Sequence, residues 1–260
     1  MRPVVFLGPS LPLAEAQAVL DAVYYSPISQ GDLTRLMDPP PGIVVIIDGR
    51  FDDVPAVWHN EILFAMERGT RVIGAASMGA LRAAELAQYG MIGVGAVYQA
   101  FRRGSLEDDD EVAVVHAPAE LGWTALSEAM VNIRATLRAA VRDKMLTDGE
   151  ASEIVAAAKA VHYPQRTWEG LARMMETSGG DLAARIRRIG AEHRVDIKAR
   201  DARAALVRAR ILQERGNFPR PAQGLMVEPT EAWLTLLDEV GCRDLYDVPP
   251  RSGGDKSLRR

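Results

Sequence analysis

Short runs of apolar residues alternate with longer amphipathic segments in the first half of the chain. Strands are predicted at residues 4–7, 43–47 and 71–75, because each run is bounded by glycine, proline or charged residues. Residues 43–47 are β-branched throughout, and a strand without polar alternation is typical of a parallel sheet covered on both faces. Residues 112–115 are predicted to add one more strand, which ends at His116.

The segments between these strands have apolar residues at helical spacing. Helices are predicted at residues 13–23, 55–67 and 78–88, the second of them opened by Pro55 and ended by Gly69. Strands that alternate with helices through short turns are typical of right-handed crossovers in an open, mostly parallel sheet. The fold class predicted for this half is therefore α/β, with helices flanking the sheet.

Beyond about residue 120 the pattern is helical almost throughout. Helices are predicted at residues 121–144, 152–161, 168–176, 182–191, 199–215 and 231–240. Pro219 and Pro221 mark a loop, and the polar end of the chain is predicted to be a flexible tail. We therefore expect an α/β core at 1–119, a mainly helical region at 120–250 that packs on the core and completes the site, and the tail at 251–260.

Composition and charge restrict the class of protein. The 260 residues are 48% hydrophobic and carry a net charge of −4, so the chain has no basic field that would attract nucleic acid or anionic lipid. No apolar run approaches the roughly 18 residues that span a bilayer. The single cysteine, Cys242, excludes an internal disulfide framework and a cysteine-based zinc site. We expect a cytoplasmic protein that holds no cofactor and binds neither nucleic acid nor a membrane.

The candidate chemistry lies in loops at the carboxyl ends of the predicted strands, where open α/β sheets gather their functional groups. Three loops qualify, at residues 8–10, 48–50 and 76–79. The third contains Ser77 between a buried strand and a helix, where the first amides of the helix have no intrahelical partner. These amides and the helix dipole can stabilise a developing oxyanion, and small neighbours let a substrate carbonyl approach. Ser77 is therefore a candidate nucleophile.

Two other interpretations of this turn remain open at the level of the sequence. Ser77 can cap the helix that follows, as serine often does, and the turn of glycine and alanine can cradle a phosphate. The G-x-S-x-G pattern of a nucleophile elbow is absent. The acidic run at residues 107–111 is interpreted as a solvated loop, because its spacing matches no known metal site.

A nucleophilic serine needs a base, for which the sequence offers histidines and lysines. His59 follows the 48–50 loop on a predicted helix, and His116 ends the predicted 112–115 strand, so either can reach the site. Only four of the 31 basic residues are lysine, and a desolvated lysine can lose its charge and deprotonate a serine. Lys159 is the candidate among the lysines, because small apolar residues surround it in the sequence.

Several segments resemble the TfuA family. The most specific is Gly-Ala-Ala-Ser-Met-Gly-Ala at residues 74–80, which continues to Leu86. The other segments lie at residues 4–10, 48–51, 58–63, 90–95, 109–116 and 159–168. The likeness covers roughly the first 120 residues well and is thin beyond Trp168.

The resemblance implies a partner of YcaO enzymes, which activate a peptide amide with ATP while it is converted to a thioamide. TfuA proteins look like hydrolases that free sulfide from a thiocarboxylated sulfur-carrier protein of the ThiS type and help to recruit the precursor peptide. Their active site is described as a Ser-Lys pair, which maps to Ser77 and Lys159 in this sequence.

The resemblance also implies a mechanism. Neutral Lys159 takes the Ser77 proton, Oγ attacks the thiocarboxylate carbon and sulfide leaves, after which water hydrolyses the acyl-serine. The groups expected to bind the oxyanion or the substrate are Gly8, Met78, Gly79 and Arg82, and the expected supporting groups are Asp48, His59, Glu61 and His116. No metal is expected at this site.

Two alternatives stay open. Residues 75–80 also resemble the nucleophile segment of Clp-type serine peptidases, for which His116 would be the first choice of base. In the other alternative the chain is a non-catalytic adaptor between YcaO and the sulfur carrier, and the Ser77 turn binds the carrier's diglycine tail without cleaving it. Replacement of Ser77 by alanine separates these classes, because only a hydrolase needs the hydroxyl.

Overall fold

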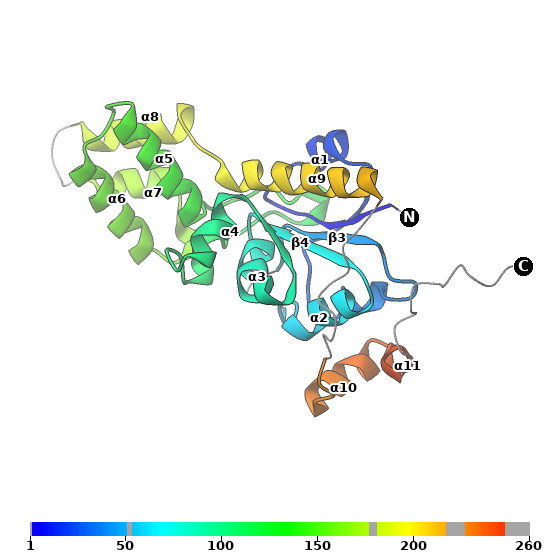
Figure 1. Cartoon of the computed structure of the whole chain (residues 1–260). Coiled ribbons are helices and arrows are strands. Elements are labelled where there is room, and N and C mark those ends of the chain that lie inside the picture. Colours follow the sequence, from blue (N-terminus) through cyan, green and yellow to red (C-terminus); the bar gives the residue numbers. More distant parts are fainter. Residues whose placement is uncertain (1, 51–53, 177–180, 217–226, 248–260) are drawn as a thin grey trace, which may run out of the picture.

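The structure is a computed structural model that describes residues 2–50, 54–176, 181–216 and 227–247 (Figure 1). The loop predicted at Pro219 and Pro221 and the tail predicted at 251–260 lie outside these residues. Within them, a parallel sheet carries helices on both faces, and a bundle of helices lies beside it. The predicted fold class, an open parallel sheet with flanking helices followed by a mainly helical part, is confirmed.

In the described part of the chain, five parallel strands form one sheet in the order β2-β1-β3-β4-β5. They are β1 (Val4–Phe6), β2 (Val23–Tyr25), β3 (Ile43–Ile46), β4 (Arg71–Ala75) and β5 (Ile92–Val94). β2 pairs with one side of β1 and β3 pairs with the other, so the strand order reverses direction between β1 and β3. The loops that follow these two strands are therefore neighbours at the carboxyl ends of the sheet. Open α/β sheets place their sites at such a switch point.

The strands predicted from the three apolar runs are confirmed as β1, β3 and β4. They are the central strands, and every residue in them is buried because helices cover both faces. The edge strands β2 and β5 are short and partly exposed, so they leave no continuous apolar run in the sequence. The strand predicted at 112–115 is wrong, because a 3-10 turn at Asp109–Glu111 leads into extended chain, in which His116 forms an isolated bridge to Ala125.

One face of the sheet is covered by α1 (Leu13–Val19) and by the long helix α9 (Ile197–Arg215) (Figure 1). Side chains of the central strands, such as Val45 and Ile73, pack there against a row of alanines on α9 that includes Ala205. Small side chains let this helix lie close to the strands. α9 therefore brings residues from late in the chain onto the N-terminal sheet.

The opposite face packs against α2 (His59–Glu67) and α3 (Met78–Leu86), with α10 (Glu231–Glu239) and α11 (Arg243–Asp247) beyond them (Figure 1). α2 begins later than the predicted 55–67 helix. Trp58 is its N-cap residue, and the Glu61 carboxylate accepts a hydrogen bond from the Trp58 amide at 3.1 Å. α3 begins at the predicted residue, directly after the turn that carries Ser77.

A helical bundle follows the α/β part (Figure 1). It consists of α5 (Met130–Arg142), α6 (Asp148–Ala160), α7 (Trp168–Met174) and α8 (Leu182–Glu192), which share an apolar core of their own. α4 (Gly95–Arg102) packs on α3 and α9. The helix predicted at 121–144 starts only at Met130, because Gly122 and Trp123 hold positive φ angles that a helix excludes. Across the described residues, no helix has both the length and the apolar character needed to cross a membrane.

Candidate active site around Ser77

The turn between β4 and α3 is strained. Ala76 has a φ of 65°, a left-handed angle that is uncommon for a residue with a Cβ. The Ser77 amide donates a hydrogen bond to the Ala75 carbonyl at 2.7 Å, which closes a three-residue turn around Ala76. Such backbone angles cost about 1–3 kcal/mol each, persist only where the surroundings enforce them, and cluster at functional sites.

Two glycines let this turn lie directly against neighbouring backbone. A Cβ on Gly79 would lie 1.7 Å from the carbonyl oxygen of Ile46, and a Cβ on Gly74 would lie 2.0 Å from the carbonyl oxygen of Gly79. Any larger residue at either position therefore forces the start of α3 away from the ends of β3 and β4. The close approach of these backbones fixes the position of Ser77.

The Ser77 side chain does not cap α3. Its hydroxyl forms no hydrogen bond to the helix amides and instead lies 3.5 Å from the carbonyl oxygen of Val112. That distance is long for an O–H···O hydrogen bond, so the contact is weak. Ser77 is only 2% exposed, and its hydroxyl is therefore enclosed by the protein.

A lysine that the sequence motifs do not single out shares this carbonyl. Lys198 Nζ donates a hydrogen bond to the Val112 oxygen at 2.7 Å, so Ser77 and Lys198 converge on one atom. Lys198 is 3% exposed, and burial lowers its pKa, although nearby carboxylates, Asp48 foremost, act in the opposite direction. A lysine with a lowered pKa is a better proton acceptor near neutral pH.

The helical spacing of α9 is the signal that could have identified Lys198. The residues of this helix that face the sheet and are buried include Lys198, Ala202, Ala205 and Ala209, which recur at intervals of three or four. Lys198 occupies a position on the buried face, although its neighbours in sequence are polar. Helix spacing is therefore a better guide to its environment than the adjacent residues are.

Asp48 joins the two loops at the switch point of the sheet. Its carboxylate accepts hydrogen bonds from the Gly8 amide at 2.8 Å, the Ser10 amide at 3.1 Å and the Ser10 hydroxyl at 2.6 Å. Asp48 is 1% exposed, and its negative charge acts on Lys198. Asp48 is therefore in a supporting position. Its carboxylate, however, already accepts the hydrogen bond of the Gly8 amide, which the resemblance assigns to oxyanion or substrate binding.

The two expected oxyanion donors of α3 differ from each other. The Gly79 amide already donates to the Ile47 carbonyl at 3.3 Å. The Met78 amide has no hydrogen-bond acceptor within the described ranges, and it lies at the positive end of the helix dipole. Met78 is therefore the better placed of the two to donate to an oxyanion.

A cavity of about 560 Å³ opens beside the first turn of α3, between Met78 and the acidic residues 107–109. Arg82 also lines it, but its guanidinium already donates to Glu85 at 2.8 Å and to the Val57 carbonyl at 3.1 Å. Glu85, which also lines the cavity, lies 2.8 Å from His59 Nε2. Arg82 and His59 are therefore both held by Glu85, and neither contacts Ser77 among the described interactions.

Lys159 lies in a separate acidic cluster. Its ammonium forms ion pairs with Asp108 at 2.9 Å, with Glu111 at 3.1 Å and with Asp110. Burial lowers its pKa, but the hydrogen bonds that the ammonium donates to these carboxylates outweigh burial and raise the pKa well above its ordinary value. These contacts oppose the expected role of Lys159 as a neutral base, and no described hydrogen bond or ion pair joins it to Ser77.

The remaining expected groups have local structural contacts. The His116 ring stacks edge-on against Trp123, with ring centres 5.0 Å apart, and its Nδ1 lies 3.0 Å from the Ala117 carbonyl. Glu61 is fully buried and accepts hydrogen bonds from the Gly31 amide at 2.9 Å and the Thr34 hydroxyl at 3.0 Å. Burial raises the Glu61 pKa. Neither side chain contacts Ser77 in the described interactions.

Residues 48–167 match the family model described as TfuA-like protein. The matched segment contains Asp48, Ser77 and Lys159, whereas Lys198 lies beyond it. A search of curated proteins returned no match to the chain. The family match supports a role associated with YcaO-type thioamidation.

Proposed function

Because residues 48–167 match the TfuA-like family model, we propose that the chain serves a YcaO enzyme by hydrolysing a thiocarboxylated sulfur-carrier protein of the ThiS type. The products are sulfide and the carrier with an ordinary carboxylate at its C-terminus. The same chain helps to bring the precursor peptide to YcaO. The chemistry is assigned to Ser77 and, in place of Lys159, to Lys198.

One observation carries this proposal. The Ser77 hydroxyl and the Lys198 ammonium both face the carbonyl oxygen of Val112, at 3.5 Å and 2.7 Å. A serine beside an enclosed lysine is a known arrangement for nucleophilic catalysis, because burial favours the neutral amine that accepts the serine proton. The strained Ala76 turn and the unpaired Met78 amide add the features expected around such a nucleophile.

The acylation step uses only these groups. Neutral Lys198 turns from Val112 and takes the Ser77 proton, while Oγ forms a bond to the thiocarboxylate carbon. The Met78 amide donates to the oxyanion of the tetrahedral intermediate. When the carbon–sulfur bond breaks, Lys198 returns the proton to the departing sulfur, which leaves as hydrosulfide. The carrier is then esterified to Ser77.

Water completes the reaction. Lys198, neutral again, removes a proton from a water molecule that attacks the ester carbon, and then protonates Ser77 Oγ as the ester bond breaks. The carrier leaves with a carboxylate. Because Ser77 is enclosed, a slender tail is required to reach it, and a cavity opens beside Met78, the next residue in the chain.

The test is sulfide release from purified thiocarboxylated carrier. Ser77→Ala and Lys198→Met are expected to lower the rate by about 100-fold or more, the range associated with removal of a nucleophile or general base. Lys144→Met serves as the matched control, since Lys144 is exposed and its side chain forms no hydrogen bond or ion pair among the described residues. Undiminished sulfide release by Lys198→Met, with a large loss in Lys159→Met, would return the base to Lys159.

The enclosure of Ser77 also favours a second candidate, a non-catalytic adaptor between YcaO and the carrier. In that case the turn holds the carrier's tail, and the hydroxyl has no chemical role. Ser77→Ala would then leave thioamide formation unchanged in a reconstituted mixture of YcaO, carrier and peptide. Loss of product with retained binding of YcaO selects the hydrolase.

A further inference from the structure

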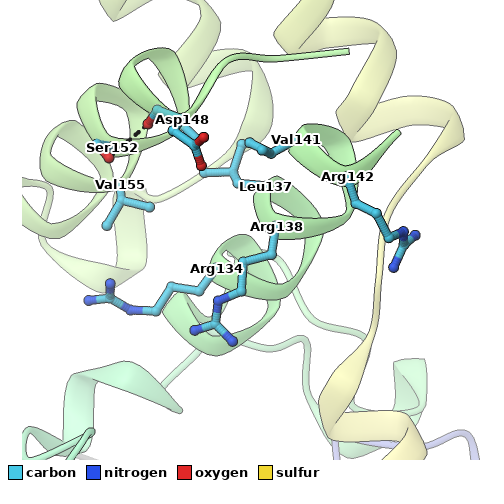
Figure 2. A pocket seen from close by; sticks show the side chains of 9 residues that line it. Arg134, Leu137, Arg138, Val141, Arg142, Asp148, Ser152 and Val155 are labelled. Atoms are coloured by element: carbon cyan, nitrogen blue, oxygen red, sulfur yellow. Dashed lines mark hydrogen bonds between the residues drawn. The ribbon is translucent and has the colours of Figure 1, made fainter. Parts of the chain in front are cut away.

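Two grooves flank helix α5 in the bundle. One, of about 530 Å³, lies between α5 and α6, and the other, of about 540 Å³, lies between α5 and α4. Arg134 and Arg138, one turn apart on α5, line both of them. Figure 2 shows these two side chains projecting beside Leu137 and Val155, whereas Arg142 points away. We call Arg134 and Arg138 the arginine ridge.

Apolar side chains line much of the first groove and part of the second, which is the more polar of the two. Leu137, Val141 and Val155 line the first, and Val97, Leu106 and Val131 line the second. Apolar side chains beside long cationic ones are complementary to an amphipathic helix whose polar face is acidic.

The charge of this surface is opposite to that of the whole molecule. The chain has a net charge of −4, yet Arg103, Arg134 and Arg138 line the second groove without an acidic residue, and Asp148 is the one acidic residue among those lining the first. Arg134 donates to both oxygens of Glu111, at 2.8 and 3.0 Å. Arg138 is exposed and has no acidic partner within the described residues, so its charge is available to a ligand.

We propose that the arginine ridge and the two grooves beside it bind an acidic amphipathic helix of a partner protein. Charge complementarity selects the acidic face, and the apolar residues that line the grooves select leucine-like side chains at helical spacing. The described lining residues include no aromatic ring on which nucleic-acid bases could stack, so the surface fits a protein segment better than a nucleic acid. This inference is independent of the hydrolysis proposed for Ser77.

The ridge also connects to the candidate active site. Arg134 holds Glu111, and the next residue, Val112, provides the carbonyl that faces both Ser77 and Lys198. A helix bound to the ridge would therefore contact Arg134, which is ion-paired with the segment that encloses Ser77.

The experiment uses fluorescence anisotropy with the full chain and a defined probe. The probe is a fluorescein-labelled peptide of about 16 residues with leucine at helical spacing and glutamate elsewhere, long enough for about four turns. Arg138→Glu is expected to weaken its binding about tenfold or more, because one charge at the centre of the surface is reversed. Arg208→Glu, an exposed arginine of α9 with no described ion pair, makes the same charge change and is expected to leave binding within about twofold.

Two further probes decide between outcomes. A peptide with glutamine in place of glutamate is expected to bind at least about tenfold more weakly, with little dependence on salt. A single-stranded oligonucleotide that binds more tightly than the acidic peptide, and loses affinity in Arg138→Glu, would show a nucleic-acid surface instead. Equal binding by the glutamate and glutamine peptides, or equal losses in the two arginine variants, would overturn the proposal. Circular dichroism confirms that each variant is folded.

Discussion

Lys198 and Lys159 lie in environments that shift the lysine pKa in opposite directions. Lys198 is enclosed, with its nitrogen donating to the Val112 carbonyl, and burial lowers its pKa by more than Asp48 and the other nearby carboxylates raise it. Lys159 is surrounded by three carboxylates that hold its proton. The difference between the two sites is the placement of acidic side chains, because both lysines lose part of their hydration.

These pKa shifts give the two lysines opposite effects on stability. The folded-state pKa of Lys198 is below its unfolded value of about 10.4, so the unfolded chain binds more protons and stability rises with pH through this interval. We expect the free energy of unfolding of the wild type to increase relative to that of Lys198→Met as the pH rises toward about 10.4, the unfolded pKa. Urea denaturation at several pH values measures this difference.

Lys159→Met is the control for that measurement. The folded-state pKa of Lys159 is above its unfolded value, so its contribution to stability is fully present below the unfolded pKa and is lost only as pH rises through the folded one. Its difference from wild type should therefore stay constant between about pH 7 and pH 9. A constant difference for Lys198→Met as well would mean that Lys198 remains charged in the folded protein.

At the scale of secondary-structure elements, the site depends on how closely α3 approaches the sheet. Gly79→Ala places a Cβ 1.7 Å from the Ile46 carbonyl oxygen, where backbone on both sides prevents relaxation. We expect this variant to lose about 3 kcal/mol or more of unfolding free energy, at the upper end of the cost of overpacking. Chemical denaturation of the purified variant measures the loss.

Gly149→Ala is the matched control. Gly149 lies in the first turn of α6, and the nearest atom to an added Cβ is the Thr147 hydroxyl oxygen at 4.0 Å. Because alanine is the better helix former, this variant is expected to gain up to about 1 kcal/mol. A loss in Gly79→Ala no larger than about 0.5 kcal/mol would mean that α3 can shift outward without cost.

At the scale of the whole molecule, the apolar central strands and the helix after Ser77 could be predicted because each is encoded by neighbouring residues. The sequence makes Ser77 a candidate on the same basis, from the small residues around it. The residues next to Lys198 in the sequence do not indicate its burial. That burial comes from the packing of α9 on a sheet whose strands lie more than 100 residues earlier in the chain. The acidic run that pairs with Lys159 is likewise distant in sequence. The apolar neighbours of Lys159 therefore suggest a neutral amine, whereas the carboxylates of that run stabilise the charged form.

Arg166 is the side chain that ties the helical bundle to the segment in front of Ser77. It is fully buried, and its guanidinium donates to the Ala158 carbonyl at 3.0 Å, to the Asp110 carbonyl at 3.2 Å and to the Asp110 carboxylate at 2.9 Å. Its removal leaves the Ala158 and Asp110 carbonyls without this donor, and a buried polar group left unsatisfied costs about 1–3 kcal/mol. The segment before Val112 would then lose the part of its connection to α6 that Arg166 provides.

Arg166→Met is therefore expected to raise hydrogen-exchange rates in the 108–112 segment and α6, while β1 and β3 stay protected by the sheet. Arg173→Met is the control, since Arg173 is exposed and its ion pair among the described residues is a surface i,i+4 pair with Glu169. Faster exchange limited to the bundle and this segment shows that the two parts of the molecule meet through Arg166. Uniformly faster exchange that includes the strands would instead show one cooperative unit, in which the carbonyl facing Ser77 and Lys198 moves only when the whole protein unfolds.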